Sequence, residues 1–327
     1  MPLYPEIEPY DHGMLDVGDG NRVYWEVCGN PRGKPAVVLH GGPGSRANAW
    51  FPRLFDPEAY RIVLLDQRGC GRSTPSASAY ETDMSVNTTD HLIADLELLR
   101  RHLGIGRWLV WGVSWGSALG LRYAQTHPES VTELVLTGVA TGSDAEVALL
   151  TRGLGQFFPE AFERFLAELP EDERHGNLPA AYNRLIESPD EAVRIRAARA
   201  WTDWETAIAA QPPRSVPRYE DPLFRYGFAR TVTHYWGNGH FLGDGGDGDG
   251  GDGDGVVLRD APLLKGIPGT LVQGSLDPGN LLGIVWRLHH AWPGSELVLV
   301  DDVGHDAGAP DMAEALVAAT DRYAGNG

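Results

Sequence analysis

Short apolar runs alternate with polar, helix-like segments through the first 140 residues of the chain. The runs fall at residues 36–39, 62–65, 108–111 and 134–136. Nearly continuous apolar runs of this length are typical of parallel strands that are covered by helices on both faces. The pattern therefore predicts an α/β protein built on a mostly parallel sheet.

Two further patterns predict a helix beside this sheet and a hairpin at its start. Leucines recur every three or four residues between positions 92 and 103, which predicts an amphipathic helix with Thr88 or Thr89 as its N-cap. Apolar and polar residues alternate over 23–27 after the turn-prone sequence GDGN. This alternation predicts an antiparallel hairpin at the start of the sheet.

The alternation of strand-like and helix-like segments ends at about residue 143. Residues 143–242 are helix-like, rich in Trp and Arg, and interrupted by prolines. Strand-like runs then return at 270–273 and 297–300, followed by an amphipathic segment at 312–323. We therefore predict an all-helical cap inserted into the sheet domain. The predicted division is a first core part (1–142), a helical cap ending in a Gly/Asp-rich loop (143–255), and a second core part (256–327).

The cap and the second core part are joined by the sequence GDGGDGDGGDGDG at 243–255. Glycine has a high entropic cost of ordering and the aspartates repel one another, so we expect a flexible loop. Gly/Asp repeats can also bind calcium in β-solenoids. Those repeats need a large apolar residue in each turn, and this run has none.

Composition narrows the classes of partner. The 327 residues carry a formal net charge of −18, which argues against binding to nucleic acid or to an anionic membrane. The two cysteines, Cys28 and Cys70, provide neither a disulfide framework nor metal-ligand spacing. The first residues lack the basic and apolar regions of a signal peptide, and no apolar stretch is long enough for a membrane span. We expect a soluble cytoplasmic protein.

The strongest chemical motif is Gly-Val-Ser-Trp-Gly at 112–116. It follows the apolar run 108–111 and precedes a helix-forming stretch, which is the context of a nucleophile elbow in the α/β-hydrolase fold. Ser114 would sit in a sharp strand-to-helix turn, at a helix N-terminus that favours developing negative charge. Ser114 is therefore the candidate nucleophile.

A second motif, His-Gly-Gly-Pro-Gly, lies at 40–44, just after the apolar run 36–39. A glycine-rich loop at this place can bring a backbone N–H close to a scissile carbonyl. We assign the oxyanion hole to the N–H groups of Gly42 and Trp115, with Gly41 as the alternative to Gly42. His40 precedes the nucleophile, whereas the base follows it in this fold, so we interpret His40 as a residue that anchors the loop.

The acid and the base should follow Ser114 in the chain. Asp277 comes just after the run 270–273, and His305 lies in the loop after the run 297–300. Both loops lie at the edge of the sheet where α/β active sites form. The alternative acids are Asp301, Asp302 and Asp306, which we interpret more simply as solvated loop carboxylates. The alternative bases are His289 and His290, which we interpret as surface or packing residues.

These residues predict acyl transfer without a metal or an organic cofactor. His305 would take the proton of Ser114, Ser114 would attack a carbonyl, and water would hydrolyse the acyl-enzyme. Asp277 would hold the tautomer of His305 and stabilise its charged form.

The motifs HGGPG (40–44), DQRGCGRS (66–73) and SWGSALGL (114–121) together resemble the proline iminopeptidase family, α/β hydrolases that remove an N-terminal proline from peptides. Two segments of the predicted cap, AWTDWE (200–205) and ARTVTHYWGNGHF (229–241), are also similar to motifs of that family. The resemblance extends from about Tyr4 to the end of the chain, apart from the Gly/Asp run. It implies the same triad.

The resemblance also implies that Glu205 binds the N-terminal ammonium of the substrate. At about 100° per residue, Trp201, Trp204 and Glu205 share one helical face, while Asp203 lies nearly opposite. A carboxylate between two indoles would pair with an amine while the rings pack on an apolar side chain. The alternative is an ordinary exposed helix glutamate.

The chain departs from the family pattern at the position of a second amine-binding glutamate, where it has Val232. It also has Ser45 and Arg46 after the HGGPG loop, and GSLD where GRYD is usual around the acid. We therefore predict a serine hydrolase that cleaves the amide bond after an N-terminal residue, acting on a small peptide or aminoacyl amide. The alternatives are an esterase or amidase for a specialised small substrate, and a non-catalytic binder on the same fold.

Overall fold

The structure is a computed structural model, and it describes residues 3–209, 216–243, 255–279 and 282–325. Eight strands form one sheet, and their bounds are β1 Asp11–Gly18, β2 Asn21–Gly29, β3 Lys34–Leu39, β4 Tyr60–Asp66, β5 Trp108–Val113, β6 Val131–Thr137, β7 Gly269–Gly274 and β8 Ser295–Val300. The strand order is β1-β2-β4-β3-β5-β6-β7-β8. The predicted hairpin is β1–β2, which is antiparallel. β2 also runs antiparallel to β4, and β3 to β8 are parallel to one another.

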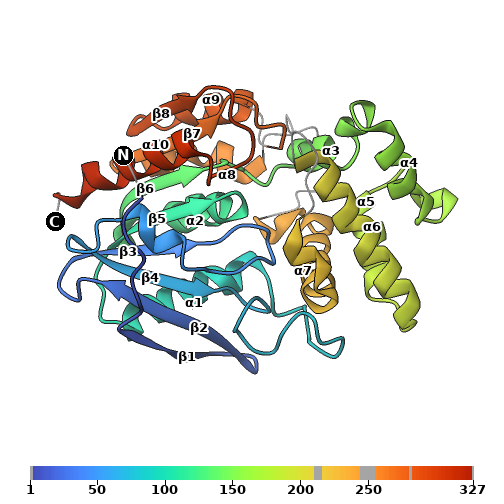
Figure 1. Ribbon diagram of the computed structural model, residues 1–327, viewed down its shortest axis with the longest axis horizontal. Coiled ribbons are helices and arrows are strands. Elements are labelled where there is room, and N and C mark those ends of the chain that lie inside the picture. The colour runs from blue at the N-terminus through green and yellow to red at the C-terminus, as the bar shows by residue number, and fades with distance from the viewer. Residues whose placement is uncertain (1–2, 210–215, 244–254, 280–281, 326–327) are drawn as a thin grey trace.

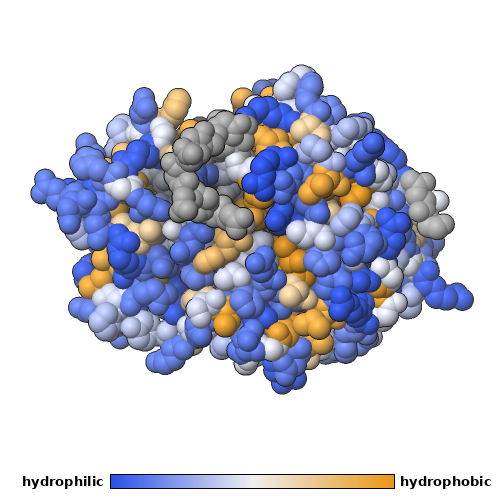
Figure 2. All heavy atoms as spheres, turned by 180° about the vertical axis from the view of Figure 1, so that it is seen from behind, coloured by the Kyte–Doolittle hydropathy of each residue, from blue (hydrophilic) through white to orange (hydrophobic). Residues whose placement is uncertain are grey.

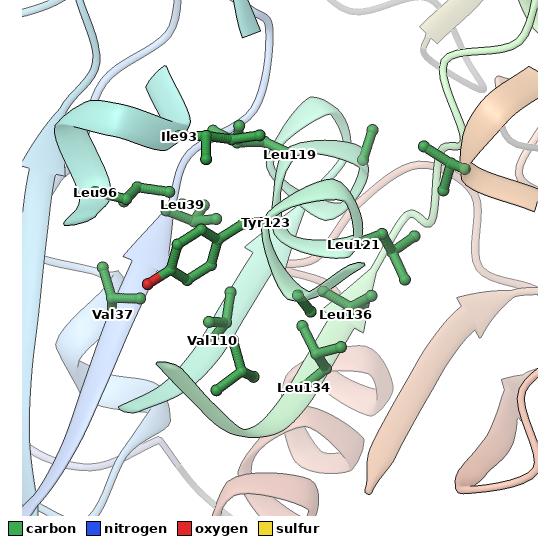
Figure 3. Close-up of a cluster of buried hydrophobic side chains, with 14 of the residues drawn as sticks. Val37, Leu39, Ile93, Leu96, Val110, Leu119, Leu121, Tyr123, Leu134 and Leu136 are labelled. Atoms are coloured by element: carbon green, nitrogen blue, oxygen red, sulfur yellow. The ribbon is translucent and has the colours of Figure 1, made fainter. Parts of the chain in front are cut away.

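Side chains alternate along the parallel strands and build a core on each face of the sheet. In β3, Val37 and Leu39 face one core, whereas Ala36 and Val38 face the other, and all four are fully buried. Figure 3 shows the first core, in which side chains of β3, β5 and β6 pack against leucines of α1 and α2 around Tyr123. Full burial of each such aliphatic side chain contributes roughly 1.5–3 kcal/mol.

The longer helices divide between the sheet and the cap. Those that pack on the sheet are α1 Thr89–His102, α2 Trp115–Thr126, α8 Gly255–Arg259, α9 Leu282–Ala291 and α10 Pro310–Ala324. The segment between β6 and β7 carries α3 Asp144–Thr151, α4 Pro159–Ala167, α5 Leu178–Ile186, α6 Glu191–Ala209 and α7 Pro222–Gly237. Short 3₁₀ turns connect several of these helices, among them Pro217–Glu220 and Gly239–Phe241.

The helices between β6 and β7 form the cap. Figure 1 shows α4, α5, α6 and α7 grouped at one end of the molecule, beyond the sheet. A third apolar core lies among these helices, with Trp201, Tyr182 and Phe165 at its centre. The predicted parallel sheet with an inserted helical cap is therefore confirmed, while the boundaries at 142/143 and 255/256 stay a prediction.

A buried arginine attaches the cap to the sheet domain. Arg230 of α7 is 3% exposed and forms a salt bridge with Glu187 of the cap, at 2.5 Å between Nε and Oε1. Its terminal nitrogens also donate to carbonyls of the 77–82 loop of the sheet domain. Because four carbonyls and one carboxylate satisfy its donors, this cation is stable away from water and fixes α7 on the core.

The surface is mainly hydrophilic. Seen from behind, charged and polar residues dominate, and apolar residues are scattered among them in small groups (Figure 2). Residues 244–254 of the Gly/Asp run lie outside the described residues. The predictions of a flexible loop and, alternatively, of calcium binding both concern this segment. The last glycine of the run, Gly255, already belongs to α8.

Candidate active site

Ser114 lies at the sharp turn between β5 and α2. Its backbone has φ 54° and ψ −125°, a left-handed conformation that costs a non-glycine residue of order 1–3 kcal/mol. The glycines on either side make the turn possible, because a Cβ at Gly116 would overlap the carbonyl of Leu39, and one at Gly112 would overlap that of Gly116. The strain is concentrated on the residue whose hydroxyl is exposed at the end of the strand.

Asp277 and His305 meet at the carboxyl ends of β7 and β8. Nδ1 of His305 lies 2.7 Å from Oδ2 of Asp277, and the other oxygen accepts the N–H of Gly279 at 2.9 Å. A carboxylate only accepts hydrogen bonds, so Nδ1 carries the proton and Nε2 is free to act as a base. The competing loop carboxylates, Asp301 and Asp302, are exposed.

The electrostatic surroundings favour a charged imidazole at His305. Burial lowers its pKa, but the charge and the hydrogen bond of Asp277 outweigh burial, with smaller contributions from Asp306 and Glu205, and the pKa is raised. The ring is also held sterically, because a Cβ at Gly138 would lie 2.8 Å from its Cε1. These contacts fix the ring and stabilise the imidazolium.

Ser114 and His305 line the same cavity. Within the described residues, their side chains do not form a hydrogen bond with each other. Such contacts between nucleophile and base are often long in a free enzyme and shorten when substrate binds.

The loop after β3 lies next to Ser114. A Cβ at Gly41 would lie 3.1 Å from that of Ser114, so only a glycine allows this approach. Gly42 lines the cavity on both sides of the nucleophile. Trp115 is the first residue of α2, where backbone N–H groups lack an intrahelical partner. Gly42 and Trp115, the two residues assigned to the oxyanion hole, therefore line the same lobe as Ser114.

His40 anchors this loop. Its ring is 1% exposed, its Nε2 accepts the N–H of Gln67 at 3.0 Å, and the Gln67 side chain donates to the carbonyl of His40. Burial lowers the pKa of His40, so the ring is neutral. These contacts agree with the interpretation of His40 as a loop anchor.

Gln273 is a neighbour of the acid that the sequence analysis did not single out. It is fully buried on β7, and its Nε2 donates to Oδ2 of Asp277 at 3.2 Å. Its Oε1 accepts the N–H of Val139 at 2.9 Å. The position immediately before the GSLD loop was the available signal, because that residue lies at the end of the strand that carries the acid.

Glu205 lies on the cap side of the cavity. Its Oε1 accepts the indole N–H of Trp201 at 2.7 Å and its Oε2 accepts the hydroxyl of Tyr219 at 3.1 Å. Burial raises its pKa to about 7, although these two donors, Arg218 and His305 act in the opposite direction. Glu205 lines the cavity together with Ser114 and His305. This carboxylate is held by neutral donors and faces the candidate nucleophile.

The two tryptophans that were predicted to bind substrate, Trp201 and Trp204, do not line this cavity, whereas Trp236 of α7 does. Trp201 is fully buried in the cap core, and Trp204 is 2% exposed and donates to the carbonyl of Leu150 at 3.0 Å. The helical face was predicted correctly, but most of that face packs inside the cap. Val232 is also fully buried in the cap core and lies outside the two sets of cavity-lining residues.

The cavity has two lobes that meet at Ser114. The first, with an empty volume of about 530 Å³, extends toward Glu205, Ile208 and Pro278. The second, about 390 Å³, extends toward Ala140, Glu146 and His240. The sheet domain supplies the candidate catalytic side chains, and the cap supplies much of the wall.

The described residues provide neither a metal centre nor a membrane-spanning helix. Among the described residues, no cluster of three or more His, Cys, Asp or Glu side chains is arranged to hold a metal ion. None of the helices in the described ranges is both long and apolar enough to cross a membrane.

Comparison with known proteins gives consistent results at the level of sequence. The alpha/beta hydrolase fold family matches residues 34–309. The chain is 79% identical over 327 residues to a probable proline iminopeptidase of Streptomyces coelicolor, covering 100% of this chain and 99% of the relative. It is 45% identical over 324 residues to a proline iminopeptidase of Xylella fastidiosa, covering 98% and 99%.

Solved structures support the fold. The crystal structure of a proline iminopeptidase from Mycobacterium smegmatis is similar, with a TM-score of 0.61 and 20% identity, covering 96% of this chain and 99% of that chain. At this identity the likeness concerns the architecture alone.

Proposed function

Because this chain belongs to the proline iminopeptidase family of the α/β-hydrolase fold, we propose that it is a serine aminopeptidase that releases proline, or another small residue, from the N-terminus of short peptides or aminoacyl amides. Ser114 is the nucleophile, His305 the general base and acid, and Asp277 the residue that orients the imidazole. Glu205 binds the free amine of the substrate. No cofactor takes part in the proposed reaction.

The reaction proceeds in two halves. Nε2 of His305 removes the proton of Ser114 as Oγ attacks the scissile carbonyl, and the N–H groups of Gly42 and Trp115 stabilise the oxyanion. The imidazolium then gives its proton to the leaving amine as the C–N bond breaks. A water molecule, activated by the same imidazole, hydrolyses the acyl-enzyme and releases the N-terminal residue.

Glu205 gives the reaction its requirement for a free amine. A carboxylate with a pKa of about 7 is only partly ionised at neutral pH. The ammonium group of a substrate would stabilise the ionised form, and the resulting charge-assisted hydrogen bond is worth about 1.5–3 kcal/mol. Trp201 and Tyr219 keep both oxygens oriented for this contact.

One observation carries the proposal: Ser114, His305 and Glu205 line the same lobe, with the imidazole on Asp277 at 2.7 Å. A nucleophile and an amine-binding carboxylate that share one cavity would select substrates whose free amine lies close to the scissile bond, as in the N-terminal residue of a peptide. An ester or amide without a free amine gains nothing from Glu205.

The test compares L-prolyl p-nitroanilide with N-acetyl-L-prolyl p-nitroanilide. We expect turnover of the free amine only, no turnover by Ser114→Ala, and a roughly tenfold to hundredfold lower kcat/KM for Glu205→Gln. Asp203→Asn is the matched control, since Asp203 is an exposed carboxylate on the same helix, paired with Arg199 at 3.7 Å. Its activity should be unchanged.

The outcomes separate the candidate functions. Equal turnover of the free and the acetylated substrate, or of simple esters alone, would favour the esterase or amidase. Failure of Ser114 to react with a fluorophosphonate would favour a non-catalytic binder. An unchanged kcat/KM in Glu205→Gln would contradict the aminopeptidase proposal.

We also propose a cytoplasmic location. The support is that both cysteines, Cys28 and Cys70, are buried and free, as is common in reducing compartments. Burial raises the pKa of Cys28 to about 12, so this thiol is unreactive. Fractionation of cells that express the tagged chain tests the location.

A further inference from the structure

One end of the second lobe is formed by buried residues. Trp115, Ala118, Glu146 and His240 line it, and none of the four is more than 5% exposed. A peptide leaving group needs a path to solvent, because its length varies. This buried end therefore suits the side chain of the residue that becomes the acyl group, provided that Glu205 binds the amine as proposed above.

His240 has an unusual conformation in this lobe. Its backbone is left-handed, with φ 55°, and its ring stacks on the indole of Trp115 at 5.4 Å between centroids and 16° between planes. Its carbonyl accepts the hydroxyl of Thr89 at 2.5 Å, at the start of α1. A strained conformation of this kind persists only where the surroundings fix it, and such positions are concentrated at functional sites.

Within the described residues, neither ring nitrogen of His240 makes a hydrogen bond that meets ordinary geometry. Nδ1 is enclosed beside the backbone of Gly142. Burial lowers the pKa of His240 to about 4, with the backbone of Gly142 acting in the opposite direction. The imidazole is therefore neutral near pH 7, with one nitrogen that donates and one that accepts.

The other polar side chain at the buried end is already occupied. Oε2 of Glu146 accepts the Thr141 hydroxyl at 2.6 Å and the Ser143 N–H at 2.9 Å, and Oε1 accepts the Thr141 N–H at 3.1 Å. These bonds belong to the capping box at the start of α3. His240 thus differs from Glu146, since a buried polar group normally has a hydrogen-bond partner and the ring of His240 has none in the part of the chain that the structure describes.

We propose that His240 is a specificity residue, which hydrogen-bonds a hydroxyl group on the side chain of the substrate's N-terminal residue. The proposed substrate class is peptides that begin with a hydroxylated residue, such as 4-hydroxyproline, threonine or serine. A hydroxyl matches a neutral imidazole, because both groups donate and accept. A negatively charged substrate side chain would be repelled by Glu146. A positively charged one would lose its hydration beside a Glu146 carboxylate that is already hydrogen-bonded to Thr141 and Ser143.

Three matched pairs of p-nitroanilides test the proposal: hydroxyprolyl against prolyl, threonyl against valyl, and seryl against alanyl. In each pair the two members differ by one hydroxyl group, whether added to the ring or side chain or exchanged for a methyl group. We expect the hydroxylated member of at least one pair to have a kcat/KM about threefold to tenfold higher in the wild type, the effect of one neutral hydrogen bond. Ratios within twofold of one in all three pairs would overturn the proposal.

Two variants attribute the preference to the ring nitrogens. His240→Phe keeps a stacked ring, and the neighbouring Phe241 already adopts φ 52°, so this variant should bring the ratio to one or below. His240→Asn keeps an amide near the ring and tolerates the left-handed backbone, so a ratio above one should remain. A wild-type ratio that persists in His240→Phe would overturn the proposal.

The design separates this inference from the proposed function. If none of the free-amine anilides is turned over, the aminopeptidase function fails and this inference fails with it. If they are turned over but the pair ratios do not depend on His240, only the role of His240 fails. Should His240→Phe not fold, His240→Leu, which also lacks the ring nitrogens, takes its place in this comparison.

Discussion

Gln273 donates a hydrogen bond to the same oxygen of Asp277 that accepts the proton of His305. The amide nitrogen lies 3.2 Å from Oδ2, and Nδ1 of the imidazole lies 2.7 Å from it. The orientation of the amide is fixed, because its Oε1 accepts the N–H of Val139. Gln273 therefore links the acid to the loop after β6, which lines the second lobe of the cavity.

We predict that Gln273→Leu changes the pH profile. Without the amide donor, Asp277 becomes more basic and stabilises the imidazolium of His305 further, so the acidic limb of kcat/KM should move to higher pH. We also expect kcat/KM on the plateau to fall about tenfold, the effect of about one lost hydrogen bond. The profile of kcat/KM with prolyl p-nitroanilide measures both effects.

The control for this variant is Gln125→Leu. Gln125 is a buried glutamine whose amide donates to the carbonyl of Val257 at 2.7 Å, away from the triad. Both variants should lose on the order of 1–3 kcal/mol of stability through an unpaired partner. An acidic limb that stays in place in Gln273→Leu, as in the control, would mean that Gln273 has a purely structural role.

The two carboxylates near His305 should differ sharply in their contribution. Asp277→Asn removes the acceptor that fixes the tautomer, and we expect kcat to fall by roughly 10⁴-fold. Asp306 raises the pKa of His305 only through its charge and is exposed. Asp306→Asn should therefore move the acidic limb slightly to lower pH and leave kcat within about twofold. Losses of similar size in both variants would contradict the assignment of the acid.

The ionised form of Glu205 should lower the free energy of unfolding of the free enzyme at alkaline pH. Its pKa is raised from 4.5 to about 7, so the native state favours the protonated form. Its contribution to stability is complete below pH 4.5 and is lost as the pH rises through 7. Glu205→Gln resembles the protonated form, so it should leave the Tm unchanged near pH 4.5 and raise it at pH 8, where the free energy of unfolding should increase by on the order of 1–3 kcal/mol.

Thermal melts of Glu205→Gln, Asp203→Asn and the wild type at pH 4.5 and pH 8 check this prediction. The Asp203→Asn curve should run parallel to that of the wild type, because this carboxylate is exposed. If Glu205→Gln is as stable as the wild type at pH 8, the carboxylate is not destabilised by burial.

The sequence predicted those parts of the fold and site that follow from local pattern and chain order. The apolar runs in the first part of the chain predicted β3 to β6, and the two runs after the cap predicted β7 and β8. Parallel strands that are buried on both faces can be recognised from a short, continuous apolar sequence alone. Asp277 and His305 were found because they follow consecutive strands, whose carboxyl ends lie side by side in this fold. Their roles as acid and base stay predictions until the variants are measured.

The remaining features depend on tertiary contacts that no local pattern encodes. The helical periodicity placed Trp201 and Glu205 on one face, but it carried no information about which part of that face packs inside the cap. His240 follows the end of α7, and its position in the cavity depends on α1 and Trp115, which are far away in the chain. Tyr219 reaches Glu205 from a separate turn of the cap.

The cavity is assembled from two layers of the molecule, and this separates two kinds of chemistry. The proposed reactive groups, Ser114 and His305, belong to loops of the sheet, whereas the proposed amine-binding side chain, Glu205, belongs to the cap helix α6. We therefore expect substitutions in α6 or α7 to change the class of substrate more than the step of bond cleavage. A library confined to the cap helices is accordingly the efficient route to engineered variants of this hydrolase.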